Sequence, residues 1–565
     1  MSNANDVPMM FRASVNGRCQ LQYIDSNRDR ATESHIERWV LEWISEVSPI
    51  APNLSQDEPE NNPAYFQTQA YQIAWRFVSN SGADPTIILP VIGARGFPHY
   101  PGSSMKGSFR QACNQVFPAR TAYYCGDREA LSPGVLRFHG GYPTSNAWTA
   151  DLIDLAHPQQ GWQVKNLDTS QKDGGAFVQI SLHQPELSFG ISSAIDLAPS
   201  EWEEIWQVWQ TALSHGIGCR VSAGYGKSPV QAELPLYRVT LKGQGVASTL
   251  LDKTPEFRPN IFRAALRGHA LRIFGGLSDA NTAEFLVEQL FGGVHNGAVW
   301  GLLNMGFRET KPFNWEPYGH FEMPYYRVTG ELTWLLTRPL EAEKEKALKS
   351  FISHLMSFAM LLGGFGKSWR RVDHREFYSN ENYEKLIGCH WTWQRPIFAS
   401  NDPDDQLQEV GGFIDRVVRA AENWIRQGEL VLNLNHPAEW REAWYRDHAQ
   451  VWGRVADHEG DSQAIKWFHQ GYDEVPRGRQ FVPTKYLKGT AVAGFTGNRT
   501  NPTRIGRLWH RMYPVIEKPT RPKERPRVKD EYLELLTFFP DSTDQDSNQL
   551  SEYLNRPRSP FTRLW

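Results

Sequence analysis

The chain has 565 residues, of which 40% are hydrophobic and 22% charged, and it carries a formal net charge of −3. This length is too great for one hydrophobic core, so we expect several packed units, and the apolar content excludes a largely disordered chain. Without an apolar run of about 18 residues, a basic leader or a CxxC pair among its five cysteines, the chain is expected to be cytoplasmic, with reduced thiols and no membrane partner.

Charge is unevenly distributed in spite of the slightly acidic total. Between Arg499 and Lys529 ten Lys or Arg residues stand against two acids, Glu517 and Glu524. Basic surfaces for a nucleic acid are therefore compatible with the composition, because the local potential steers such a partner.

The first of two similar patterns begins at residues 71–80. There Ile73, Trp75 and Phe77 alternate with polar neighbours and predict a half-buried strand. Farther along, residues 201–213 are rich in tryptophan and have helical spacing, and the glycine-rich turn SHGIGCRVSAGYGKSPV follows them. The pattern thus closes on a glycine-rich loop.

A helix is expected between these segments, in PGSSMKGSFRQACNQVF. After the Pro-Gly turn, Ser103 or Ser104 is expected to cap it, because a serine hydroxyl accepts a bond from a free N–H group of the first turn. The apolar face at helical spacing is Met105, Phe109, Ala112 and Val116.

The same order of elements returns from residue 237. The segment YRVTLKGQGV predicts a strand, and Asn260 is expected to cap a helix. The apolar face of that helix is Phe262, Leu266, Ala270 and Ile273. A strand at 326–336, a helix in ALKSFISHLMSFAMLL and the glycine-rich GGFGKSWRRVDHR complete the second copy.

Both copies read as strand, helix, strand, helix and glycine loop, which predicts an α+β fold of tandem split βαβ, ferredoxin-like (RRM-like) domains. The boundaries are expected at 1–236 for the first domain and 237–398 for the second, because a polar break follows at 399–406. Residues 399–565 are expected to be a C-terminal extension with a basic, Pro-rich stretch at 518–530. Its segment TGNRTNPTRIGRLWHRMYP resembles a further glycine loop and leaves a third, partial unit open.

The motifs PGSSMKGSFR and GIGCRVSAGYGK, with YYCGDREALSPGVLRFHGGYP between them, resemble the helix start and glycine-rich loop of the repeat-associated mysterious proteins (RAMPs), the Cas subunits that coat CRISPR RNA. The second copy resembles more divergent members and lacks the Gly-Ser-Ser-x-Lys-Gly core. The resemblance covers roughly residues 65–375. It implies a type III CRISPR effector subunit whose partners are guide RNA, complementary target RNA and other Cas subunits.

In such a protein the glycine loops and basic side chains are expected to hold RNA phosphates, because glycine lets N–H groups approach an anion and cations add salt-dependent affinity. The residues assigned to RNA are Ser103, Ser104, Lys106, Arg110, Gly216, Gly218, Gly224, Gly226, Lys227, Arg263, Arg267, Gly364, Gly366, Lys367, Arg370 and Arg371. Ordinary turn geometry also explains such glycines, and Arg263, Arg267 and Arg272 are equally consistent with the solvated side of a helix.

Catalytic type III backbone subunits resemble one another in an Asp shortly before the Pro-Gly-Ser-Ser turn, which acts with a divalent metal on target RNA. Asp84 stands in the matching place and Asp252 in the corresponding part of the second copy. The resemblance therefore implies that both are catalytic metal ligands, with Mg²⁺ as the expected ion and Mn²⁺ as the alternative. A turn-forming Asp before Pro85 is the ordinary explanation of Asp84.

Three alternatives stay open. The first is a guide-binding or capping scaffold subunit that does not cleave. The second is a guide-processing ribonuclease that uses histidine as acid and base, for which His215, directly before the glycine loop, is the candidate. The third is an unrelated Trp-rich ligand-binding protein, supported only by the 21 tryptophans.

Overall fold

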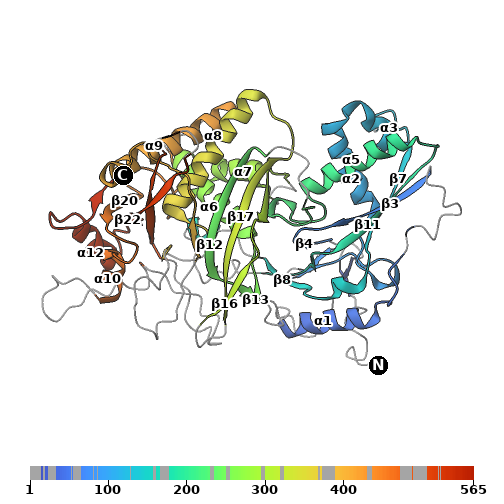
Figure 1. Cartoon of the computed structure of the whole chain (residues 1–565), viewed down its shortest axis with the longest axis horizontal. Helices are drawn as coiled ribbons and strands as arrows, with labels where there is room; N and C mark the ends of the chain where they lie inside the picture. The colour runs from blue at the N-terminus through green and yellow to red at the C-terminus, as the bar shows by residue number, and fades with distance from the viewer. Residues whose placement is uncertain are drawn as a thin grey trace.

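The structure of the protein is a computed structural model. The residues that it describes are 14–16, 20–22, 33–52, 54, 65–79, 82–84, 87–127, 129–156, 161–165, 177–229, 235–249, 255–293, 299–318, 323–366, 370–371, 389–428, 436–470, 487, 506–519, 521 and 524–565. None of the helices in these ranges has both the length and the apolar content needed to cross a membrane. Helices gather on sheets that succeed one another along the molecule (Figure 1), which confirms the expected α+β class.

The first sheet has the strand order β3-β11-β7 and is antiparallel. Its strands, with helix α2 between the first two and helix α5 after the last, are β3 (Phe66–Gln72), α2 (Gly102–Val116), β7 (Leu136–Pro143), β11 (Glu186–Ser193) and α5 (Pro199–His215). In chain order this is a βαββα unit with the sheet order 1-3-2, as in a split βαβ fold.

The place of a fourth strand is taken by the glycine-rich loop. Beside β4 (Arg76–Phe77), Cys219 N donates to Val78 O at 2.8 Å and Gly226 N donates to Arg76 O at 2.6 Å. The predicted strand 71–80 is therefore interrupted, because the chain stops pairing with β11 at Gln72 and turns to β10 (Leu182–His183) and to this loop.

The second sheet has the complete order β15-β17-β12-β19. Its elements are β12 (Tyr237–Val246), α6 (Asn260–Leu277), α7 (Ala280–Phe291), β15 (Leu303–Glu309), β17 (Met323–Leu336), α8 (Ala342–Phe358) and β19 (Cys389–Thr392), with β16 (Asn314–Tyr318) paired to β17. In chain order the strands are 2-3-1-4, and every pairing is antiparallel. This is the expected ferredoxin-like topology.

A third sheet of the same topology occupies the region expected to be an extension. The order β23-β20-β22-β21, with β18 beyond β21, repeats the 4-1-3-2 arrangement. Its elements are α9 (Pro403–Gln427), β20 (Gln450–Ala456), α10 (Gln463–Gln470), β21 (Leu508–Glu517), β22 (Arg527–Phe538), α12 (Gln545–Leu554), β23 (Thr562–Arg563) and β18 (Arg370–Arg371). The possible third, partial unit stays a prediction, although this sheet has the same strand order as the second.

The described chain also has smaller strands and α-helices. They are β1 (Ser14–Asn16), β2 (Gln20–Gln22), α1 (Glu33–Glu46), β5 (Gly82–Asp84), β6 (Ile87–Leu89), α3 (Thr121–Cys125), β8 (Ile153–Ala156), α4 (Gly161–Lys165), β9 (Phe177–Ile180), β13 (Ser248–Thr249) and β14 (Pro255–Glu256). Strands β5, β6, β9 and β8 form a separate small sheet. Among these elements, strand β14 carries Glu256 to the first unit.

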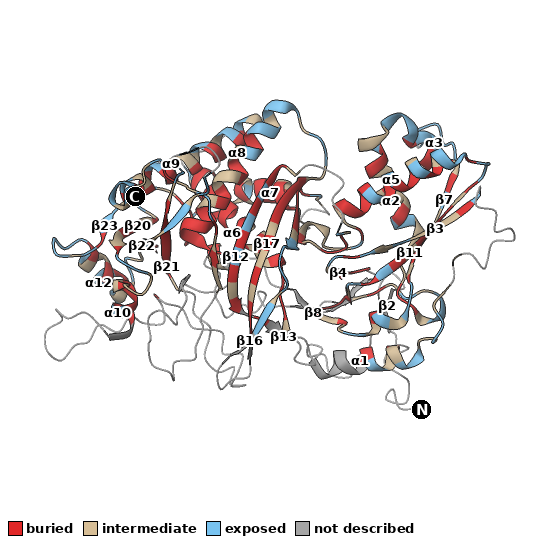
Figure 2. Ribbon diagram, viewed as in Figure 1, coloured by how far each residue is buried: buried red, intermediate tan, exposed pale blue. Residues whose placement is uncertain are grey.

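Helix α6 is buried around most of its circumference, whereas its sequence was equally consistent with one solvated side. Gly275 and Gly276 explain this: a Cβ on Gly276 would lie 2.0 Å from Trp444 O, so only glycine lets the segment around Trp444 cross the helix. Arg272 is likewise buried, and its Nε donates to Glu442 at 2.8 Å. Figure 2 shows buried residues continuing from the second sheet into the third, where one hydrophobic core joins both.

Two predicted helix caps are wrong. Helix α2 begins at Gly102 and its N-cap is Pro101, with no side-chain cap, so Ser103 and Ser104 lie inside the first turn. Helix α6 begins at Asn260, and Pro259 is its N-cap, again without a side-chain bond. In both cases a proline already supplies the backbone angle at which a helix can start. The polar break at 399–406 does hold a cap, since Asp402 accepts bonds from Asp404 N and Asp405 N.

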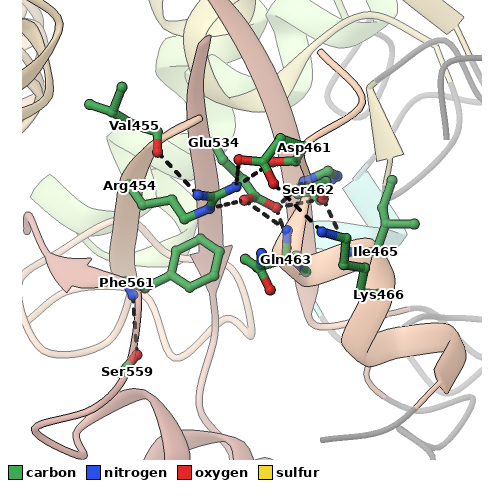
Figure 3. Close-up of polar contacts among 12 residues, drawn as sticks. Arg454, Val455, Asp461, Ser462, Gln463, Ile465, Lys466, Glu534, Ser559 and Phe561 are labelled. Carbon is green, nitrogen blue, oxygen red and sulfur yellow. Dashed lines mark hydrogen bonds and ion pairs between the residues drawn. The ribbon is translucent and has the colours of Figure 1, made fainter. Parts of the chain in front are cut away.

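A buried polar cluster fastens α10 to the third sheet (Figure 3). The carboxylate of Glu534 on β22 accepts from Gln463 N and Ala464 N at the start of α10, and it pairs with Arg454 Nε at 2.6 Å. Ser462 donates to the same carboxylate at 2.5 Å. A carboxylate at a helix N-terminus satisfies free N–H groups there, so this cluster has a structural explanation.

Candidate nucleic-acid interface

The start of α2 is fixed against β7 by two glycines. A Cβ on Gly102 would lie 2.0 Å from Phe138 O, and one on Gly140, whose φ is +81°, would lie 2.1 Å from Tyr100 O. Tyr100 and Gly141 exchange backbone hydrogen bonds of 2.9 Å. Only glycine allows this close approach, which sets the first turn of α2, with the residues of the Pro-Gly-Ser-Ser motif, in a defined place.

A cavity of about 490 Å³ opens beside this helix. Its lining is Ser103, Lys106, Gly107, Arg110, Cys125, Gly126, Asp127, Leu131, Ser132 and Pro133. The predicted RNA-binding residues of α2 other than Ser104 therefore meet at one hollow. Ser104 is exposed on the same turn.

The cavity is net basic among the residues that line it. Arg110 is held in place by donating from Nη2 to Cys125 O at 2.8 Å, and Lys106 is one helical turn away. Burial raises the pKa of the Cys125 thiol to about 11, so the thiol adds no negative charge. Asp127, the one acid among the described residues of the lining, accepts backbone bonds from Glu129 and Ala130. Two cations beside an uncapped helix N-terminus form a suitable place for a phosphate.

The glycine-rich loop of the first unit is shaped by its own packing. Gly216, Gly218, Gly224 and Gly226 all have positive φ, between 67° and 98°. A Cβ on Gly226 would lie 1.9 Å from Ile217 O. The backbone N–H groups that bond protein carbonyls are those of Gly216, Ile217, Cys219, Ala223, Gly224 and Gly226. These N–H groups are therefore occupied, and contact of the loop with phosphate stays a prediction for its remaining groups.

Lys227, directly after this loop, lies in the interior. It is 7% exposed, and its Nζ has no hydrogen-bond partner among the described residues. Burial lowers the pKa of this amine to about 7. The predicted RNA contact of Lys227 finds no support in this position and stays a prediction.

His215 ends α5, and its carbonyl accepts a bond from Asn304 Nδ2 on β15. This bond ties the last turn of α5 to the second sheet. The predicted acid or base role of His215 stays a prediction, because its neighbours there are structural.

A buried ion cluster joins the first two units, and sequence reasoning missed it. Arg76 Nε pairs with Glu256 Oε1 at 2.5 Å, and Arg258 reaches both Glu256 at 2.9 Å and Asp154 at 3.6 Å. Tyr225, from the glycine loop, donates to Asp154 at 2.6 Å. Burial alone would raise the pKa of Asp154, but the guanidiniums of Arg76 and Arg258 outweigh it and hold that pKa below its ordinary value. The only sequence signal was a charged residue inside an alternating strand.

Arg263 and Arg267 lie near Arg220 where the glycine loop meets α6. Burial, and then the guanidiniums of Arg267 and Arg220, lower the pKa of Arg263 to about 9. Arg263 donates from Nη2 to Phe291 O at the end of α7. Both helix residues are half-buried, so they are neither simply solvated nor sealed in the core. Arg220 was not among the predicted residues.

The glycine loop of the second unit closes against α6. Gly364 and Gly366 have φ of 63° and 81°, and Gly364 O lies 3.2 Å from His269 Nε2. Arg370 and Arg371 form β18, which pairs in parallel with β21, so the backbone of these two residues belongs to the edge of the third sheet. Lys367 lies outside the described residues.

The two predicted catalytic residues are not tested by the geometry. Asp84 ends β5, but its side chain lies outside the described part of the chain, and Asp252 lies outside it altogether. Within the described residues no group of three or more His, Cys, Asp or Glu side chains could hold a metal ion. The predicted Mg²⁺ site therefore stays a prediction, and no catalytic step is derived from it.

Comparison with known proteins does not identify a family for this chain. No family model matches the chain and no curated protein matches it. One solved structure that matches is described as "Cryo-EM structure of the Type III-B Cmr-beta bound to cognate target RNA", at 14% sequence identity and a TM-score of 0.21. The match covers 29% of this chain and 58% of that chain. A TM-score of 0.21 is too low to establish a common fold.

Proposed function

We propose that this chain is an RNA-binding subunit of a type III CRISPR effector complex, with guide RNA, target RNA and other Cas subunits as partners. The observation that carries the proposal is the cavity beside α2, where Ser103, Lys106 and Arg110 of the Pro-Gly-Ser-Ser motif meet. The motif's resemblance to RAMP proteins and the repeated split βαβ topology support the same function. Contacts of this kind bind the RNA backbone and leave sequence reading to the guide.

The test is the affinity of the chain for single-stranded RNA as a function of salt. Each phosphate contact contributes about 0.7 to the salt slope on a single strand, so Lys106→Ala/Arg110→Ala is expected to lower the slope by about 1.4. The matched control is Lys346→Ala/Lys349→Ala, which removes two exposed cations from α8. If the α2 variant and the wild type have the same salt slope of RNA binding, the cavity is not part of the RNA-binding surface.

We further propose, as a separate step, that Asp84 and Asp252 support cleavage of target RNA with Mg²⁺ or Mn²⁺. When bound, the metal would stabilise the negative charge that develops at the scissile phosphate. The experiment is target cleavage by the reconstituted complex with Asp84→Ala, Asp252→Ala and both changes, beside the exposed control Asp196→Ala. Loss of one distinct product for each change supports two cutting sites. An unchanged product pattern leaves a scaffold subunit, and cleavage of a guide-RNA precursor that survives a chelator but not His215→Ala indicates guide processing by histidine.

A further inference from the structure

One edge of the first sheet is open where the other two sheets have a further strand. In the second sheet β19 pairs with β12, and in the third β23 pairs with β20, both antiparallel. Strand β3 is the counterpart of β12 and β20, but among the described residues only β11 pairs with it. The glycine loop covers this edge farther along, where Ala74 N donates to Lys227 O and Gly226 N donates to Arg76 O. The edge along Phe66–Gln72 is left open.

The backbone of β3 alternates between β11 and this open edge. Just before the strand, Ser193 N donates to Tyr65 O at 2.8 Å. Just after it, Ile73 N donates to Pro185 O at 2.9 Å. Because the bonds of an antiparallel ladder alternate along a strand, the odd-numbered residues of β3 point to β11. The outward N–H and C=O groups, which have no backbone partner within the described ranges, belong to Phe66, Thr68, Ala70 and Gln72.

This edge lacks the features that usually keep edge strands apart. The strand reads FQTQAYQ, with no charged residue and no proline, and its register with β11 has no bulge. The opposite edge of the same sheet is different, because β7 contains Arg137, its register with β11 shifts, and Tyr100 bridges to Gly141. An open strand without charge, proline or bulge pairs readily with another strand. The edge of β3 therefore has the properties of a pairing site.

The side chains beside this edge are largely neutral. On the face toward α5, Trp206 Nε1 donates to Gln67 at 2.9 Å, and α5 exposes Gln207 and Gln210 on that side. The exposed acid Glu203 lies one turn before Gln207, nearer the start of α5. Like charges directly opposite each other would disfavour strand pairing. Two copies of this edge can approach each other without meeting that obstacle at the centre of the strand.

We propose that β3 pairs antiparallel with β3 of a second copy of this chain, about a twofold axis at Gln69. In this register Thr68 lies opposite Ala70 of the other copy and Phe66 lies opposite Gln72. Every outward N–H and C=O group of these four residues then meets a partner. Any shifted register leaves some of them unpaired, so the symmetric pairing uses the edge completely. The two three-stranded sheets join into one continuous sheet. This surface is independent of RNA and goes beyond the proposed function.

The first experiment measures association of the full-length chain by sedimentation equilibrium up to about 200 µM, because an interface made by two edge strands is small and weak. Ala70→Pro removes one outward N–H group from each copy and no bond to β11, and proline is tolerated on the free side of an edge strand. It is expected to weaken dimerisation by about tenfold or more while leaving the Tm of the monomer nearly unchanged.

A second variant of the same residue acts by charge. Ala70→Lys places two ammonium groups diagonally across the axis and is also expected to weaken the dimer. The matched control is Ala122→Lys, the same change at an exposed position on α3, which should leave the association unchanged.

The register is tested by crosslinking. At the axis Gln69 lies opposite its own copy in a pair without mutual hydrogen bonds, where the Cα atoms are about 4.5 Å apart and a disulfide fits. Oxidation of Gln69→Cys should therefore give a covalent dimer. Gln67→Cys lies opposite Tyr71 and should not, and the wild type, with its own five cysteines, gives the background.

Three results would overturn the inference. The first is a wild type that stays monomeric up to about 200 µM, which would leave the edge to a strand of another protein. The second is a dimer whose affinity neither Ala70 variant changes. The third is a covalent dimer that Gln67→Cys forms as readily as Gln69→Cys. None of these measurements uses RNA, so a wild type that binds no RNA would overturn the proposed function alone.

Discussion

Lys227→Met is expected to stabilise the folded protein, and the gain is expected to depend on pH. The wild-type amine is 7% exposed and lacks a hydrogen-bond partner among the described residues. Burial lowers its pKa from 10.5 to about 7. Each pKa unit corresponds to about 1.4 kcal/mol, so keeping this ammonium buried costs up to about 5 kcal/mol.

The pH range follows from the two pKa values. Below about pH 7 the lysine is protonated in both states and the full cost applies. Between about pH 7 and 10.5 unfolding takes up a proton, so the wild-type free energy of unfolding rises with pH. The advantage of Lys227→Met should therefore be largest at pH 6 and fall to about 1–2 kcal/mol near pH 9.5.

The assay is urea denaturation at both pH values, followed by tryptophan fluorescence, with Lys346→Met on the exposed side of α8 as control. The control removes a lysine that is not buried, so its effect should be small and independent of pH. A difference between Lys227→Met and wild type that stays constant from pH 6 to pH 9.5 would refute the reasoning. So would a loss of stability at pH 6, because it would mean that the ammonium makes a favourable interaction.

Further changes test other positions. Gly102→Ala should destabilise the chain by several kcal/mol, since its Cβ would lie 2.0 Å from a β7 carbonyl, whereas Gly107→Ala on the same helix has nothing within 4 Å and should gain up to about 1 kcal/mol; thermal unfolding compares them. Glu256→Ala leaves Arg76 buried without its carboxylate and should cost about 3–5 kcal/mol in chemical denaturation. The pKa of Glu534 is lowered in the folded protein, so the ionised carboxylate stabilises the fold above pH 4.5 and this stabilisation is lost in acid. In Glu534→Gln the free energy of unfolding should therefore fall less steeply as the pH is lowered.

Periodic segments of the sequence were predicted well because their spacing reflects the burial of one face. Helices α2 and α5 and strands β12 and β17 lie where the patterns predicted. The third sheet was not predicted from the sequence, although its strand order repeats that of the second sheet. Strand β21 is buried along almost its whole length and includes His510, Arg511 and a proline, so it shows neither alternation nor the usual composition of a strand.

The candidate site, like the fold, could be predicted from the sequence only in part. Local geometry determined the α2 cavity: Lys106 and Arg110 share a helix face because they are one turn apart, and Gly102 sets the start of that helix. Tertiary structure decided the rest. Nothing local to Lys227 directs it inward, and nothing local to Arg220 brings it to Arg263.

The sequence by itself thus determined element types, the repeated split βαβ order and the positions of the basic residues that are predicted to contact RNA. Only the tertiary structure decided which of those charges are compensated. Arg76 finds Glu256 180 residues away, and Arg272 finds Glu442 170 residues away. Electrostatic energy depends on distance and on burial, and the packing of one unit on another sets both.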